Sequence, residues 1–232
     1  MLIAAVGLIG SGKDTVADRL VDQYGFRRDS FASSLKDAVA VVMGWDRKKL
    51  EGKTAEDREW REQVDQWWAK RLGIPHLTPR WVLQQWGTEV FRRHFHDDIW
   101  IASLEHKLLY NKQDVVISDC RFPNEVGMVR AAGGKVIRVI RGTEPEWFPV
   151  AIEACLGNEE AKEWLKLQLV HESEWAWANT TFDAVFVNDK TLADLYLLVD
   201  DFIKSPVSGP LASNPRHGTW DRLDSWRTRS AD

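Results

Sequence analysis

The sequence predicts an α/β fold in which a mostly parallel, five-stranded sheet is flanked by helices. Short apolar runs alternate with helical patterns along residues 1–204, which is typical of a parallel sheet covered on both faces. The first run, residues 2–6, ends in a glycine-rich turn that leads directly into a helix. The chain has 232 residues, 44% of them hydrophobic, enough for one such domain with an insertion.

The turn after the first strand, residues 7–15, reads Gly-Leu-Ile-Gly-Ser-Gly-Lys-Asp-Thr. A strand, a glycine-rich turn, a lysine and a helix in this order form a phosphate-binding loop, or P-loop. The backbone N–H groups and the helix N-terminus face phosphate oxygens, and Lys13 reaches the β- and γ-phosphates. The sequence therefore predicts a P-loop NTPase fold; the alternative is a tight turn without a ligand. The residues expected to contact ATP here are Gly10, Ser11, Gly12, Lys13, Asp14 and Thr15.

The residue after the lysine departs from the usual motif. That position normally holds Ser or Thr, whose hydroxyl meets Mg²⁺. Here it holds Asp14, and Thr15 comes one residue later. A carboxylate is a suitable hard oxygen ligand for Mg²⁺, but it also places negative charge near the phosphates. We expect Mg²⁺ as the cofactor, with both Asp14 and Thr15 as candidate ligands.

The remaining elements follow from the apolar pattern and the turn residues. Pro123 suits the first turn of a helix that ends near residues 133–134. Further strands are expected at 26–31, 114–119, 136–140 and 184–187, and further helices at 32–43, 60–72, 80–93, 98–110, 159–170 and 191–203.

The chain is expected to form one domain, 1–204, followed by a tail. Residues 45–112 read as a helical insertion outside the sheet. Residues 142–160 carry prolines and a glycine among acids, and are expected to be a mobile lid. From residue 205 to 232 Pro, Gly, Ser and Arg dominate, which predicts a poorly packed tail.

Two charged residues follow the strand at 114–119. Asp119 ends that strand, where an acid beside a P-loop helps to hold Mg²⁺; the alternative is an acid that caps the next turn. Arg121 lies two residues on, so its guanidinium can reach the same edge and neutralise charge during phosphoryl transfer. Cys120, between them, is expected to face the core.

Further arginines are candidate phosphate ligands. Arg138 and Arg141 lie at the end of the strand that leads into the lid, and cations on a closing lid would stabilise a transferring phosphoryl group. Arg138 is assigned to ATP and Arg141 to catalysis; the alternative for each is a solvated strand end. Of Arg92 and Arg93, one is expected to bind phosphate and the other to be a surface charge.

Composition excludes several classes of function. A net charge of −4 argues against a dedicated nucleic-acid binder. No apolar run approaches membrane-spanning length, and the chain enters its first strand without a signal peptide. The two cysteines suggest neither a disulfide framework nor a zinc site. We expect a cytoplasmic protein, and we expect most of its 13 tryptophans to be packing residues.

Several motifs together resemble the deoxynucleoside monophosphate kinases of tailed bacteriophages. The most specific is Asp-Cys-Arg-Phe-Pro-Asn-Glu at 119–125. The resemblance covers residues 1–203 in the same order. The other matching strings are at 7–17, 31–36, 83–89 with Arg92, 171–175 (His-Glu-Ser-Glu-Trp) and 187–191 (Val-Asn-Asp-Lys-Thr).

The resemblance implies a nucleoside-monophosphate-kinase fold, ATP as donor, Mg²⁺, a deoxynucleotide acceptor and a homodimer. In a phage it would place the protein in the cytoplasm of the host bacterium. It also assigns the acceptor nucleotide to Leu35, Lys36, Gln84, Thr88, Glu89, Arg92, Arg121 and Trp175. Helix–helix contacts would equally explain Gln84, Thr88 and Glu89, which share one face of the predicted helix.

The function expected is reversible transfer of the γ-phosphoryl group of ATP to a deoxynucleoside 5′-monophosphate. One alternative is another small-molecule kinase on the same scaffold, of the dephospho-coenzyme A or phosphomevalonate type. A second is a nucleotide-dependent switch without kinase activity. A third is nucleic-acid binding through the arginines of the tail.

Overall fold

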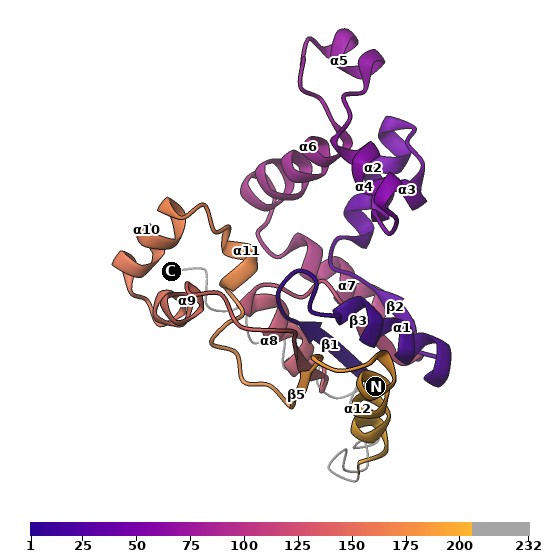
Figure 1. The fold of residues 1–232 in the computed structure, drawn as a ribbon. Coiled ribbons are helices and arrows are strands. Elements are labelled where there is room, and N and C mark those ends of the chain that lie inside the picture. The colour runs from indigo at the N-terminus through magenta and orange to yellow at the C-terminus, as the bar shows by residue number, and fades with distance from the viewer. Residues whose placement is uncertain (206–232) are drawn as a thin grey trace, which may run out of the picture. The chain divides into compact units, whose positions relative to one another are not determined.

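The computed structural model describes residues 1–205. The predicted tail therefore lies outside the described residues, except for Ser205, whose N–H donates to Asp201 at the end of the last helix. Backbone contacts divide the chain into two units. One comprises residues 1–30 and the chain from residue 108 onward, and the other comprises residues 31–107. Figure 1 shows the elements of both.

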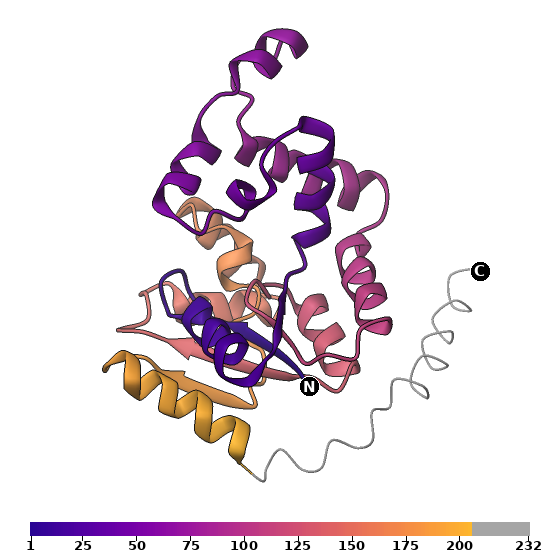
Figure 2. The ribbon, with the colours of Figure 1, turned by 90° about the vertical axis from the view of Figure 1, so that its right-hand side faces the viewer.

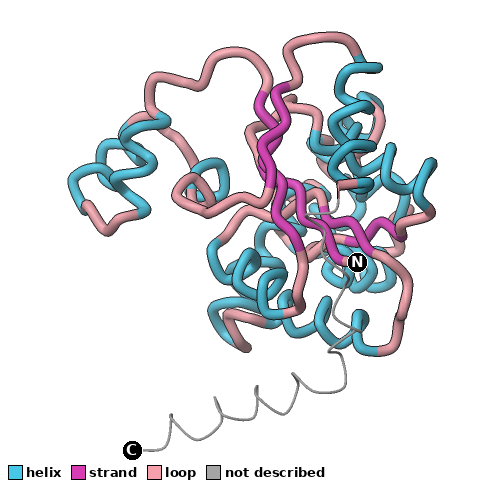
Figure 3. Tube along the Cα trace, turned by 90° about the horizontal axis from the view of Figure 1, so that it is seen from below, coloured by secondary structure: helices cyan, strands magenta, loops and turns pink. Residues whose placement is uncertain are grey.

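The first unit contains a single sheet of five parallel strands, which confirms the predicted fold class. The strand order is β2-β3-β1-β4-β5. The central strand is β1, and the chain adds β2 and β3 on one side of it and β4 and β5 on the other. The turn that follows β1 therefore lies at the carboxyl edge of the sheet, where parallel sheets bind ligands. Figure 3 shows the strands as the central layer of this unit. The strands are β1 (Leu2–Val6), β2 (Arg27–Asp29), β3 (Val115–Ile117), β4 (Lys135–Ile140) and β5 (Ala184–Val187).

Helices cover this sheet because alternate strand residues point to opposite faces. Ile3, Val116 and Ile137 point to the face covered by α1 and α12, where they pack against Leu20 and Leu195. Figure 2 shows α1 and α12 side by side, while α8 packs against β1 and β4. The helices of this unit are α1 (Lys13–Tyr24), α8 (Pro123–Ala131), α9 (Phe148–Cys155), α10 (Glu159–Leu167), α11 (Glu172–Trp175) and α12 (Leu192–Lys204).

The second unit is helical and has its own apolar core. Buried Leu35, Val39 and Trp100 pack there with partly buried tryptophans, which confirms the packing role expected for these indoles. Within residues 1–205 no helix is long and apolar enough to cross a membrane. The helices are α2 (Ser33–Met43), α3 (Arg47–Glu51), α4 (Ala55–Glu62), α5 (Gln66–Leu72), α6 (Pro79–Gln84), the π-helix η1 (Gln85–Arg92) and α7 (Ile99–Leu109), whose last residues belong to the first unit.

Three predicted elements differ from the structure. The helix expected at 60–72 is wrong: α4 ends at Glu62 and α5 begins at Gln66, because the Asp65 carboxylate accepts from Trp68 N and caps a new helix. The helix expected at 80–93 changes into a π-helix after Gln84. The segment 142–160 contains α9, whose inner face buries Phe148, although its prolines suggested an excursion; Pro149 occupies a tolerated first-turn position.

Candidate functional site

The loop between β1 and α1 has a backbone that only glycine adopts easily. Gly7, Gly10 and Gly12 have φ values of 145°, 78° and 107°. A Cβ on Gly7 would lie 2.3 Å from the carbonyl oxygen of Val139, and one on Gly12 would lie 2.5 Å from Asn188 Nδ2. The loop is therefore packed closely against the ends of β4 and β5. Conformation and space both require glycine at Gly7 and Gly12, whereas Gly10 is required by its conformation alone.

Lys13 begins α1 and its side chain folds over the loop. Its Nζ donates to the carbonyl oxygens of Gly7 at 2.8 Å and Leu8 at 2.7 Å. The pKa of Lys13 is lowered from 10.5 to about 8, because burial and then the Arg121 charge lower it more than Asp14 and Glu174 raise it. The Lys13 ammonium thus interacts with three charged side chains, Arg121, Asp14 and Glu174, in a place where a bound phosphate would offset the cost of burying its charge.

Two of the candidate metal ligands, Asp14 and Thr15, directly follow this lysine in α1, and the third, Asp119, follows β3. The Asp14 side chain is 80% exposed, and its Oδ1 accepts from Ser118 Oγ at 3.1 Å and from Arg28. Thr15 and Asp119 are half-buried. Among the described residues no three His, Cys, Asp or Glu side chains are grouped to hold a metal ion. The donor set is one of hard oxygens, which fits Mg²⁺ because that ion takes one or two protein ligands and completes its shell with phosphate and water.

Arg121 is held by contacts at both its ends. Its Nη1 donates to Glu174 Oε1 at 2.8 Å and to Ser173 Oγ at 3.3 Å, both on α11. Its backbone N–H donates to Glu125 Oε2 at 2.7 Å, and Phe122 N–H donates to the same oxygen at 3.2 Å. Glu125 is only 3% exposed. The buried carboxylate thereby fixes the turn that carries Arg121, and the guanidinium lies close enough to Lys13 to lower its pKa.

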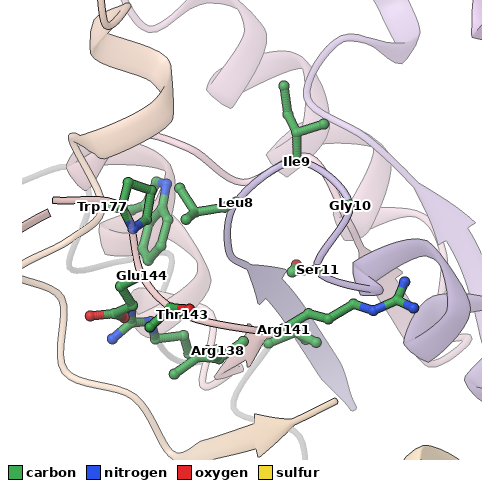
Figure 4. Close-up of a pocket in the computed structure, with 12 residues that line it drawn as sticks. Leu8, Ile9, Gly10, Ser11, Arg138, Arg141, Thr143, Glu144 and Trp177 are labelled. Atoms are coloured by element: carbon green, nitrogen blue, oxygen red, sulfur yellow. The ribbon is translucent and has the colours of Figure 1, made fainter. Parts of the chain in front are cut away.

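Arg138 and Arg141 have different surroundings, as Figure 4 shows. Arg138 forms an ion pair with Glu144, and its guanidinium lies 4.5 Å from the ring centre of Phe148 and 5.4 Å from that of Trp177. Arg141 is exposed and extends beside the loop near Ser11. Both arginines line a cavity of about 220 Å³ together with loop residues 8–11. Arg138 thus has protein partners, whereas Arg141 presents its charge beside the P-loop.

Two buried side chains near Arg121 differ in their chemistry. Burial, then Glu125 and Asp119, raise the pKa of the Cys120 thiol well above 9.0, so the thiol stays protonated as a core residue. Trp175 is 7% exposed, and its Nε1 is buried without a hydrogen-bond partner in the described part of the chain. Its indole is therefore largely buried on α11, with one unused hydrogen-bond donor.

The other predicted acceptor residues belong to the second unit. Lys36 Nζ donates to Glu51 Oε2 at 2.6 Å. Leu35 is buried and packs against Gly87 so closely that a Cβ on this glycine would lie 2.9 Å from Leu35 Cδ2. The structure thus brings α2 next to η1. Gln84 ends α6, whereas Thr88, Glu89 and Arg92 lie in η1, so the α-helical spacing used to group them does not continue past Gln84.

Four residues around the loop were not predicted as site residues. Arg28 contacts Asp14, Glu174 contacts Arg121, Glu125 fixes the Arg121 turn, and Asn188 Nδ2 donates to Ser11 O at 2.8 Å. Three of them lie in strings that carry the resemblance: 119–125, 171–175 and 187–191. Only Arg28 lies outside every such string, so no sequence signal pointed to it.

Two curated relatives are similar to this chain. A protein of Acanthamoeba polyphaga mimivirus named a deoxynucleotide monophosphate kinase is 28% identical over 211 residues, covering 84% of this chain and 92% of the relative. The deoxynucleoside-5′-monophosphate kinase of Escherichia phage T5 is 29% identical over 179 residues, covering 56% of this chain and 72% of the relative. No protein-family model matches the sequence.

Solved structures with a similar arrangement include two kinases. Shikimate kinase from Aquifex aeolicus has 14% identity and a TM-score of 0.44, with 90% of this chain and 100% of that chain covered. Dephospho-CoA kinase from Campylobacter jejuni has 16% identity and a TM-score of 0.39, with 88% and 95% covered. At these TM-scores neither structure bears on the activity of this chain. The curated relatives are named after the family that the motifs resemble, and they confirm that resemblance: the chain is similar to viral deoxynucleoside monophosphate kinases.

Proposed function

We propose that this protein transfers the γ-phosphoryl group of ATP to a deoxynucleoside 5′-monophosphate and releases ADP and the deoxynucleoside diphosphate. The observation that carries the proposal is that two cations lie close together. Lys13 lies on the glycine loop, and the charge of Arg121 is near enough to lower the pKa of this lysine. Two cations at the carboxyl edge of a parallel sheet suit a triphosphate. The names of the two viral relatives supply the acceptor class.

The acceptor phosphate oxygen is already anionic, so the reaction needs no general base. Catalysis then consists of in-line positioning and of charge neutralisation by Lys13, Arg121 and Arg141. Asp14, Thr15 and Asp119 would hold Mg²⁺, which would supply further neutralisation of phosphate charge.

The contact proposed between Arg138 and ATP requires that guanidinium to exchange Glu144 for phosphate, whereas Arg141 needs no such exchange because it is already exposed beside the loop. Arg141 is therefore the lid cation that we assign to the transferring group. The lid itself, residues 142–160, includes α9 and follows directly from β4.

The acceptor residues are proposed from the motifs. The unusual geometry of η1 supports them, because π-helical turns occur frequently at functional sites. Thr88 and Gln84 are exposed, so their side chains are accessible to a nucleotide. The full proposed set is Leu35, Lys36, Gln84, Thr88, Glu89, Arg92, Arg121 and Trp175.

The test is a screen of acceptors with coupled detection of ADP. It includes the common deoxynucleoside monophosphates, 5-substituted dUMP and dCMP, dephospho-coenzyme A and phosphomevalonate. We expect turnover with at least one deoxynucleotide, and Lys13→Ala should lower kcat about a hundredfold or more. Turnover only with dephospho-coenzyme A or phosphomevalonate would overturn the acceptor class. Binding of ATP without transfer to any acceptor would support the nucleotide-dependent switch.

The protein is further proposed to be a homodimer in the cytoplasm of an infected host. Apolar side chains on the second unit support dimerisation, since Val41 on α2 is 83% exposed and Trp67 on α5 is 64% exposed. Sedimentation velocity at micromolar concentration tests this. A concentration-independent monomer would refute the dimer without affecting the proposed reaction.

A further inference from the structure

We propose that Arg28 is a positioning residue that neutralises Asp14, so that a loop ending in Lys-Asp accepts a triphosphate. The inference rests on the proposed function only in that this loop binds a nucleotide. It explains how the chain tolerates a carboxylate where P-loops usually carry a hydroxyl.

Arg28 contacts Asp14 from the edge of the sheet. Arg28 lies in β2, and its Nη2 donates to Asp14 Oδ1 and to Ser118 Oγ at 3.0 Å. Its Nη1 donates to Asp18 Oδ1 at 2.7 Å, one turn further along α1. Ser118, directly after β3, also donates to Asp14 Oδ1. Neighbouring strands β2 and β3 thus hold the same carboxylate oxygen from two directions.

The Arg28 side chain is only 24% exposed, whereas that of Asp14 is 80% exposed. A guanidinium in this partly buried position is less screened by solvent than a free surface charge, and its planar fork can contact two carboxylates at once. Arg28 is therefore built into the sheet edge, and the carboxylate it neutralises faces outward.

The charge of Asp14 acts within the phosphate site. Asp14 lies in the first turn of α1 next to Lys13, and its carboxylate raises the pKa of that lysine against the effect of burial. The same field that stabilises the Lys13 ammonium opposes an incoming triphosphate. The Arg28 guanidinium cancels this repulsion while leaving the carboxylate in place as a candidate metal ligand.

The inference is tested by calorimetric titration with ADP in the absence of divalent cations. Arg28→Ala should weaken ADP binding about tenfold at low ionic strength, because the carboxylate then lacks its counter-charge. Asp14→Asn in the same chain should restore the affinity to within about threefold of wild type, because it removes the repulsion itself. Asp18→Asn is the matched control, since it removes another partner of Arg28 and should leave ADP binding unchanged.

Arg28→Gln is the second variant and keeps a long polar side chain at this position. It should repeat the loss and the restoration if Arg28→Ala does not fold, as judged by thermal melting. Unchanged binding by a folded Arg28 variant would overturn the inference, as would a loss that Asp14→Asn fails to restore. A wild-type protein that does not bind ADP would overturn the proposed function as well, so the two failures are distinguishable.

Discussion

Raising the pH from 7 to 9 should weaken ATP binding about tenfold, because Lys13 loses its proton in this range. Burial and then the Arg121 charge, partly opposed by Asp14 and Glu174, lower the pKa of Lys13 from 10.5 to about 8. The protonated fraction of the free protein is then about 0.9 at pH 7 and about 0.1 at pH 9, and the apparent affinity scales with the fraction that is competent to bind.

The assay is a fluorescence titration with a non-hydrolysable ATP analogue without divalent cations, at constant ionic strength. Lys13→Arg is the matched control, because its guanidinium remains charged throughout; its affinity should be lower but flat with pH. A wild-type affinity that is constant from pH 7 to 9 would refute the assigned titration. So would an equal decline in Lys13→Arg, since the loss would then come from another group.

The free energy of unfolding should respond to the same titration with the opposite sign. Between pH 8 and 10.5 the unfolded chain holds a proton on this lysine that the folded chain has lost, so stability rises with pH. The depression of the pKa corresponds to about 3 kcal/mol at most. Urea unfolding of the wild type and of Lys13→Met isolates this contribution, because the variant lacks the pH-dependent increment while other groups still titrate.

Three further changes test the core and the site. Leu20→Ala should lower the free energy of unfolding in urea by about 2–5 kcal/mol, since Leu20 is fully buried between α1 and the sheet; a loss below about 1 kcal/mol would contradict this packing. Gly12→Ala should abolish ADP binding in a titration, because its Cβ would lie 2.5 Å from Asn188 Nδ2 at a positive φ; normal affinity would disprove the close approach. Glu125→Ala should lower kcat more than it raises KM and should cost about 1–3 kcal/mol of stability, because it leaves the Arg121 turn without its acceptor. Glu125→Gln should partly rescue both quantities, and equal kinetics for the two variants would argue against a positioning role.

The fold class could be predicted because its signals are local. Apolar runs of strand length and the glycine loop depend on neighbouring residues alone, and all five expected strands are present. The helix boundaries in the helical unit were harder to predict. Its short helices are separated by capping residues such as Asp65, and the spacing of apolar residues does not reveal where a cap interrupts a helix. Likewise η1 has α-helical composition, and its wider turn is a property of the packed unit.

The site was predicted in part for the same reason. Lys13 and its loop are read from one continuous motif, and Arg121 from its position after a strand. Arg28 and Glu174 were not predicted, because each acts through a contact between segments far apart in the chain. Short edge strands commonly carry charged residues. Nothing in the sequence therefore indicates that Arg28, rather than its neighbour Arg27, contacts the loop.

The order of the strands constrains how the chain can fold during synthesis. The third strand lies between the first two in the sheet, and the second strand pairs with it alone. Residues 31–107 are therefore translated while both earlier strands lack a backbone partner, and they contain a core of their own. Because the core of the helical unit comes from these residues alone, we expect this unit to collapse on the ribosome before the sheet is complete. The unit that carries the glycine loop cannot complete its sheet until residue 117 has emerged, so the loop is synthesised early and reaches its final packing late.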